Sequence, residues 1–184
     1  MFKIVVVCLA LLITGCTTPQ QDTNYPAEIT GIGDSSTYPI MAAGFQRGKT
    51  WTYAPGMTNI STGYNMYSSQ NHIASTIYLY PATTTLDVMF EAEKQNIVNA
   101  HNDAKVGGTK EFTLSKNGKD YRALEVTFQY KSDFMGRQQD VFSQLVLWQH
   151  KEKFIKLRST SPLSEGESTL AKNKALLGAV NWAF

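Results

Sequence analysis

Cysteine is nearly absent from this chain, which limits the chemistry that its side chains can support. Two cysteines occur in 184 residues, Cys8 and Cys16, and both lie near the N-terminus. The sequence contains no C-x-x-C, H-x-H or H-E-x-x-H pattern, so neither a metal site nor a redox dithiol is indicated. We therefore expect no metal and no cofactor, and a domain that is stabilised by its core rather than by disulfides.

An excess of one charge is also missing. The chain has 17 basic and 15 acidic side chains and a formal net charge of +2. Proteins that bind nucleic acids normally concentrate basic residues on one face, so we expect no nucleic-acid partner. The 42% share of hydrophobic residues is close to that of ordinary globular domains.

One apolar run is present at the N-terminus. It covers residues 4–13, follows Lys3, and gives way to small and polar residues. The run is shorter than the roughly 20 residues of a membrane-spanning helix, and its order is that of a secretory signal peptide. The alternative is a buried element at the start of the domain, which would leave the abrupt change after the run unexplained. We expect residues 1–15 to be a cleaved signal peptide.

The run ends in Ile13-Thr14-Gly15-Cys16, which resembles the lipobox of bacterial lipoproteins. In that family the cysteine thiol receives a diacylglycerol, the signal is cut just before it, and the new amine is usually acylated by a fatty acid such as palmitate. The resemblance implies that Cys16 carries lipid and that the membrane is a partner. Thr17 is not the aspartate that holds lipoproteins at the inner membrane, so the resemblance implies an outer-membrane lipoprotein that faces the periplasm. Two or three acyl chains anchor stably where a single chain binds only marginally.

The rest of the chain divides into a spacer and one domain. Residues 16–40 contain the polar, proline-containing string "TTPQQDTNYP" and show no amphipathic period, which predicts a lipidated cysteine followed by a flexible tether. Residues 41–184 have the length of one ordinary domain.

Within the domain, most of the sequence follows the period of strands. "HIASTIYLYP" predicts a strand, and residues 83–105 then change to a helical period. Asn117-Gly118 separates two alternating runs, which is the strongest hairpin signal in the chain. Ser164 and Glu167 form an S-x-x-E capping box that predicts the start of a last helix. We expect an α+β fold, with one antiparallel sheet of about six or seven strands, a meander in the C-terminal half, and two main helices packed on the sheet.

The order of these elements is similar to that of the PsbP-like and DcrB-like families of periplasmic lipoproteins over residues 45–184. The matching pieces are "HIASTIYLYP", the helix after it, and "FIKLRSTSP" before the last helix. The resemblance implies a central antiparallel sheet with helices packed on it and a role in binding or assembly. It implies no catalytic motif.

Basic residues gather near one predicted strand. Lys156 and Arg158 share a strand face with Phe154, and Lys151 and Lys153 lie in the turn before it. These four basic residues are a candidate interaction surface for anionic lipid headgroups or for an acidic partner. The alternative is a solvated strand face whose lysines discourage pairing between sheet edges.

Aromatic residues concentrate in the first three predicted strands. They could line a binding groove, because tyrosine combines apolar area with a hydroxyl, or they could pack in the core under a helix. The residues are Trp51, Tyr53, Tyr64, Tyr67, Tyr78 and Tyr80.

One short motif suggests an enzyme. Gly33-Asp34-Ser35 resembles the opening block of GDS-type esterases, in which the serine is the nucleophile. Such a serine needs a base, which those enzymes take from a D-x-x-H block, and no D-x-x-H occurs in this chain. The alternative is a turn beside the tether.

Together these features favour a membrane-anchored periplasmic lipoprotein that acts as a non-catalytic binding or envelope-assembly module. Its expected partner is a membrane-adjacent protein or another envelope component. A GDS-type serine esterase that uses Ser35 remains the alternative.

Overall fold

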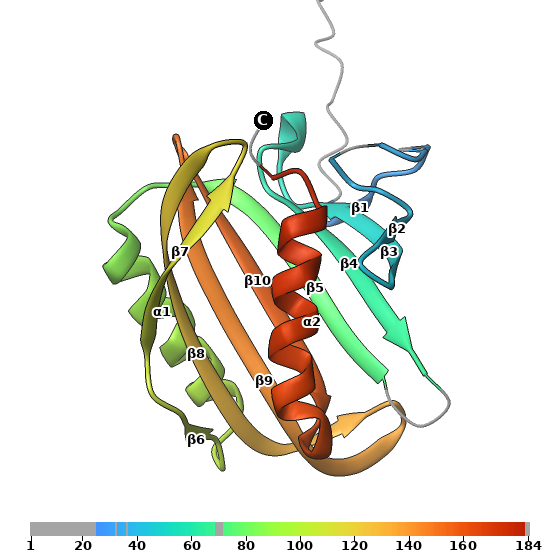
Figure 1. The fold of residues 1–184 in the computed structure, drawn as a ribbon, viewed down its shortest axis with the longest axis vertical. Helices are drawn as coiled ribbons and strands as arrows, with labels where there is room; N and C mark the ends of the chain where they lie inside the picture. Colours follow the sequence, from blue (N-terminus) through green and yellow to red (C-terminus); the bar gives the residue numbers. More distant parts are fainter. Residues whose placement is uncertain (1–24, 32, 36, 69–71, 183–184) are drawn as a thin grey trace, which may run out of the picture.

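A ten-stranded antiparallel sheet dominates the part of the chain that the structure describes. The computed structural model describes residues 25–31, 33–35, 37–68 and 72–182. Its strands are β1 (Ala27–Glu28), β2 (Met41–Ala42), β3 (Phe45–Thr52), β4 (Ile60–Tyr67), β5 (His72–Pro81), β6 (Lys105–Val106), β7 (Lys110–Lys116), β8 (Lys119–Phe134), β9 (Arg137–His150) and β10 (Lys153–Pro162). Its helices are α1 (Leu86–Ala100) and α2 (Gly166–Ala179), with the short 3-10 turns η1 (Pro55–Met57) and η2 (Leu163–Glu165). The strands lie in the order β1-β3-β4-β5-β10-β9-β8-β6, with β2 paired to β3 and β7 paired to β8 (Figure 1).

The expected α+β fold with six or seven strands is wrong. Strands take up 52% and helices 23% of the described residues, so this part of the chain is mostly antiparallel β-sheet. The three additional strands, β1, β2 and β6, have two residues each, which is too short to show an alternating pattern. The mainly polar residues 131–139, which the sequence places between strands, instead complete β8 and β9 and turn at Met135-Gly136.

The folded part also starts earlier than the sequence predicts. β1 pairs with Trp51 and Thr52 of β3, so the end of the segment 16–40, expected to be a free tether, is attached to the sheet. Residues 1–24, which contain the predicted signal peptide and Cys16, lie outside the described residues.

One helix packs on each face of the sheet. In Figure 1, α2 crosses the front of the sheet, where it contacts β9 and β10, and α1 lies against β8 and β9 on the opposite face. Residues 141–148 of β9 are all buried. They are buried because β9 lies between the two helices, so its sequence shows no clear polar face.

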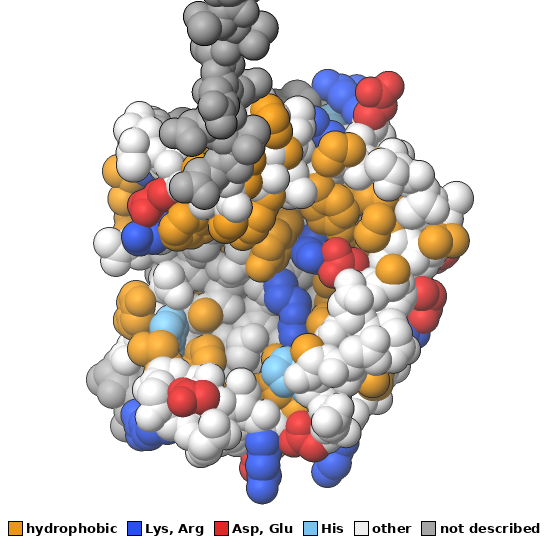
Figure 2. Space-filling model, turned by 180° about the vertical axis from the view of Figure 1, so that it is seen from behind, with side chains coloured by type: hydrophobic (Ala, Val, Ile, Leu, Met, Phe, Trp, Pro, Cys, Tyr) orange, Lys and Arg blue, Asp and Glu red, His pale blue; other side chains and the backbone are white. Residues whose placement is uncertain are grey.

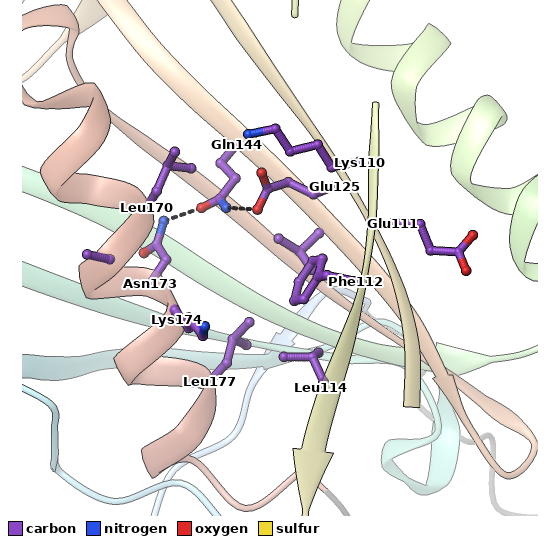
Figure 3. A pocket seen from close by; sticks show the side chains of 12 residues that line it. Lys110, Glu111, Phe112, Leu114, Glu125, Gln144, Leu170, Asn173, Lys174 and Leu177 are labelled. Carbon is purple, nitrogen blue, oxygen red and sulfur yellow. Dashed lines mark hydrogen bonds between the residues drawn. The ribbon is translucent and has the colours of Figure 1, made fainter. Parts of the chain in front are cut away.

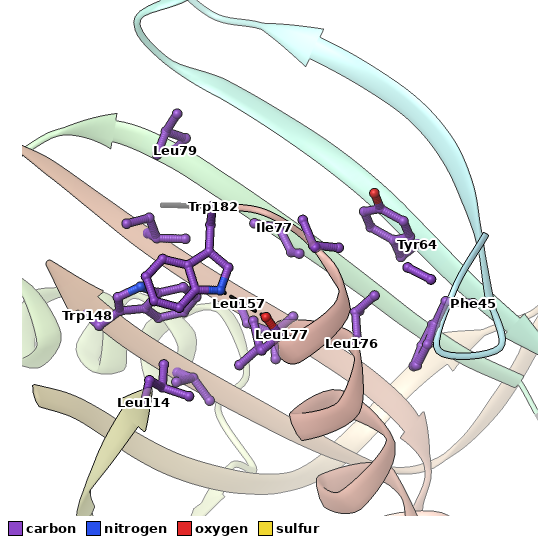
Figure 4. Packing of buried hydrophobic residues seen from close by; sticks show 14 of the residues in the cluster. Phe45, Tyr64, Ile77, Leu79, Leu114, Trp148, Leu157, Leu176, Leu177 and Trp182 are labelled. Carbon is purple, nitrogen blue, oxygen red and sulfur yellow. Dashed lines mark hydrogen bonds between the residues drawn. The ribbon is translucent and has the colours of Figure 1, made fainter. Parts of the chain in front are cut away.

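The core on the α2 side is closed by the residues that follow this helix. Leu176 and Leu177 of α2 pack with Trp148 of β9 (Figure 4). Trp182 meets Trp148 edge to face, with ring centroids 5.0 Å apart, and donates its indole N–H to the main-chain oxygen of Leu177 at 2.9 Å. On the other face, Phe90 of α1 is the centre of a second apolar cluster. The two faces therefore have separate cores, with β9 common to both.

Candidate binding sites on the two faces of the sheet

A groove lies between α2 and β7. The hairpin of β7 and β8 curls over the sheet, so β7 forms one wall and α2 the other (Figure 3). The cavity has a volume of about 320 Å³. Half of its twelve lining residues are apolar, namely Phe112 and Leu114 of β7, Val146 of β9, and Leu170, Ala171 and Leu177 of α2.

A chain of polar side chains ends in this groove. Asn173 of α2 donates to Gln144 Oε1 at 2.7 Å, and Gln144 Nε2 donates to Glu125 Oε2 at 2.8 Å (Figure 3). Ser75 of β5 donates to Asn173 Oδ1 at 2.9 Å. Asn173 is fully buried and Gln144 is 3% exposed, so each bond replaces one that the group would otherwise make with water. The chain fixes α2 on the sheet and places the Glu125 carboxylate at the groove.

The wall formed by β7 has an edge that is open for pairing. Asn117 and Gly118 have φ angles of 51° and 71°, as a type I′ turn requires. In such a hairpin the two residues that flank the turn exchange hydrogen bonds, and the bonded pairs alternate from there. The main-chain groups of Glu111, Thr113 and Ser115 therefore point away from β8. Among the described strands, β7 pairs with β8 alone.

The α1 face carries a second hollow. Helix α1 covers β8 and β9, and beside it Tyr53, Tyr78, Tyr80, Glu93 and Lys156 line a cavity of about 290 Å³. Figure 2 shows this face from behind, with basic side chains inside its hollowed part. Lys156 Nζ lies 2.7 Å from Glu93 Oε1 and 4.4 Å from the centre of the Tyr78 ring. Burial and the neighbouring Glu93 raise the pKa of Tyr80, whose hydroxyl donates to Glu93 at 3.0 Å.

Arg158 lies on the same face, two residues further along β10. Its guanidinium donates to Ser143 Oγ and, at 3.1 Å, to the Tyr130 hydroxyl, and its Cζ lies 5.5 Å from the centre of the Phe128 ring. The ring of His101, at the end of α1, stacks on Tyr130 with centroids 3.7 Å apart. Burial lowers the pKa of Arg158, and burial followed by the charge of Arg158 lowers the pKa of His101.

The structure separates the four residues of the predicted basic surface. Lys156 and Arg158 point into the α1 face, as their shared strand face predicts. Lys151 and Lys153 both line a different cavity, with His150 and Trp182, on the α2 side. Lys151 is exposed in the turn between β9 and β10. The four side chains therefore do not form one strip.

The sequence left open whether the aromatic residues line a binding groove or pack in the core, and the structure shows some of them in each place. Tyr64 is fully buried in the α2-side core, whereas Tyr53, Tyr78 and Tyr80 line the hollow on the α1 face. Tyr67 is 62% exposed and stacks on His72 at a centroid distance of 4.4 Å.

Ser35 and Asp34 both hydrogen-bond to nearby main-chain groups. Ser35 Oγ accepts from the Tyr38 amide at 3.0 Å, and Asp34 Oδ1 accepts from the Ile40 amide at 2.9 Å. These are the contacts of a turn. Within the described residues, no group of three or more His, Cys, Asp or Glu side chains is placed to hold a metal ion.

Sequence reasoning missed the polar chain under α2. Thr169 and Asn173 are both fully buried and lie four residues apart on the helix, so they share one face. Polar residues on the buried face of an amphipathic helix are a signal that could have been found. Their partners on β5, β9 and β10 could not be found from the sequence, because those contacts depend on the sheet order.

Comparison with known proteins adds no relative: no family model matches the chain, and no curated protein matches it. Neither helix in the described part of the chain has the length and apolar character needed to cross a bilayer.

Proposed function

We propose that this protein is an envelope lipoprotein whose domain is a non-catalytic binding module, and that it holds an extended segment of a membrane-adjacent partner in the groove between α2 and β7. The observation that carries this proposal is the open edge of β7 beside an apolar groove. An extended peptide can add to such an edge through main-chain hydrogen bonds, while alternate side chains enter pockets next to it.

The edge of β7 differs from the other outer strands. β1, β2 and β6 have two residues each, and very short edge strands resist pairing with other chains. β7 has seven residues and offers the main-chain groups of three alternating positions. A strand added there would place every second side chain beside Phe112 and Leu114, which explains why the groove is apolar.

Charge at the groove favours an acidic segment. Lys110 and Lys174 are exposed on its two walls, and Lys116 Nζ donates to the Gly178 main-chain oxygen where β7 and α2 meet. The lining also holds two carboxylates, and both already have partners: Glu125 Oε2 accepts from Gln144, and Glu111 pairs with Arg122 at 2.9 Å. The partner segment that fits this groove therefore alternates apolar and acidic residues.

Replacing Thr113 with proline tests this proposal. The Thr113 N–H points away from β8, so proline removes a donor from the open edge and leaves the β7–β8 ladder intact, as proline is tolerated at such edge positions. With the full chain, a synthetic peptide that alternates valine and glutamate should bind, and Thr113→Pro should weaken binding about tenfold, measured by calorimetry.

Thr113→Ala is the matched control, because it keeps the amide and should bind the peptide as the parent does. A peptide that alternates valine and lysine should bind more weakly than the acidic one. Binding that is equal in Thr113→Pro and the parent, with both proteins folded by circular dichroism, would show that the β7 edge is not used.

The membrane anchor is a separate part of the proposal. Cells grown with a radioactive fatty acid should label the protein, and Cys16→Ser should lose the label and retain the uncut N-terminus, because the thiol is the acceptor of the lipid. Mass spectrometry of the labelled protein should find no peptide from residues 1–15. Label that persists in Cys16→Ser would refute the anchor without affecting the groove.

A further inference from the structure

We infer that the α1 face binds an oxyanion, a carboxylate or phosphate group, at Arg158, which lies two residues along β10 from Lys156 in the lining of the hollow. This site is separate from the groove between α2 and β7, and it does not depend on the proposed peptide. The inference starts from the position of a positive charge that lacks a negative partner.

Arg158 is largely enclosed, yet its hydrogen-bond acceptors are neutral. They are the hydroxyls of Ser143 and Tyr130 and, at 3.5 Å, the main-chain oxygen of Gln144. Of the ion pairs in the described part of the chain, none includes Arg158. A guanidinium has five N–H donors, and a charge taken out of water is costly unless it is paired. An anion beside Arg158 supplies that pairing.

The acidic groups nearby are already engaged. Glu93 accepts from both Lys156 and Tyr80. Asp103 is exposed and accepts from the Lys131 main-chain N–H. Lys156 and Glu93, the charged residues that line the hollow, form an ion pair, so Arg158 beside it is the positive charge of this face that lacks an acidic partner among the described ion pairs.

The sheet register places further donors next to Arg158. Thr76 of β5 lies opposite Arg158, and Tyr78 lies opposite Lys156. Tyr78 and Tyr80 line the cavity, so the group that carries the anion would lie against aromatic rings. Arginine favours carboxylate and phosphate because its planar donors match two oxygens at once. The ligand class is therefore an oxyanion attached to an apolar or ring-containing body.

Two sources can supply this chemistry, a free small molecule and the headgroup of an anionic lipid. Titration of the full chain with inorganic phosphate and with benzoate, followed by the NMR signals of the His101 ring, tests the free molecule. Cosedimentation with vesicles of phosphatidylcholine alone, or mixed with phosphatidylglycerol, tests the lipid. Saturable shifts with phosphate or benzoate would support the site. So would tighter binding to the vesicles that contain phosphatidylglycerol than to those of phosphatidylcholine alone, because the lipid anchor proposed at Cys16 attaches the chain to either kind.

Arg158→Gln should weaken the observed binding about tenfold or more, whereas Arg158→Lys should restore part of it, because a charge-assisted bond is lost in the first variant alone. Lys153→Gln, on the opposite face of the same strand, removes the same type of charge outside the hollow and should bind as the parent does. If Arg158→Gln fails to fold, the titrations of the unaltered protein still show whether the site binds an anion. No binding in any of the arms, or equal losses in Arg158→Gln and Lys153→Gln, would overturn the inference.

Discussion

Replacing Leu176 with alanine should lower the free energy of unfolding by about 2–5 kcal/mol. Leu176 is fully buried in the cluster that joins α2 to the sheet (Figure 4). The substitution removes buried apolar area and leaves a cavity that the long strands beneath it cannot fill. The measurement is denaturant unfolding of the full chain, followed by circular dichroism.

Two other positions of the same helix serve as controls. Lys174 is exposed, so Lys174→Ala should change the free energy of unfolding by less than about 0.5 kcal/mol. Leu177 is 3% exposed but lines the groove, so Leu177→Ala opens a space continuous with the groove and should cost less than Leu176→Ala. A loss below about 0.5 kcal/mol for Leu176→Ala would mean that α2 is not docked as the structure shows.

Replacing Asn173 with alanine should have an effect of similar size for a different reason. The substitution removes the acceptor of the Ser75 hydroxyl and the donor to Gln144 Oε1, and all three groups are buried. The Ser75 hydroxyl keeps Ser159 Oγ as a partner at 3.0 Å, so Gln144 Oε1 is the group that loses its donor. A buried polar group that loses its partner costs about 1–3 kcal/mol, which is the loss expected here.

A double-mutant cycle separates this loss from the loss of packing. Ser75→Ala and Asn173→Ala each remove one partner of the same hydrogen bond, so the double variant should be more stable than the sum of the two single losses predicts. Purely additive losses in denaturant unfolding would indicate that Ser75 and Asn173 are not coupled.

The long strands and the hairpin could be predicted because their signals are local. The turn at Asn117-Gly118 has the φ angles that this dipeptide predicts, and α1 lies within the helical segment that the sequence indicates. The predicted start of α2 was less accurate. Ser164 of the predicted capping box lies inside η2, and Glu167 lies in the first turn of α2. The helix begins at Gly166 without a side-chain cap. Here the short turn, rather than the S-x-x-E pattern, leads the chain into the helix.

The sites were harder to predict than the strands, because they depend on contacts between distant segments. The shared face of Lys156 and Arg158 follows from strand alternation and is confirmed by their register with Tyr78 and Thr76. The pairing of Lys156 with Glu93 joins a strand to a helix 63 residues away, and no local pattern contains it. The groove between α2 and β7 exists because the β7–β8 hairpin curls over the sheet. The order of the strands along the chain does not predict that curl.

Gln144 contacts both of the sites described above. Its main-chain oxygen lies 3.5 Å from Arg158 on one face, and its side chain joins Asn173 to Glu125 on the other. If both of the proposed ligands bind, a shift of this residue at one site would be felt at the other, without a hinge or a change of fold. Any cooperativity that results must be reciprocal, because the free energy by which an anion alters peptide affinity equals that by which the peptide alters anion affinity. The central strand thus gives the protein a means of responding to two ligands as a pair.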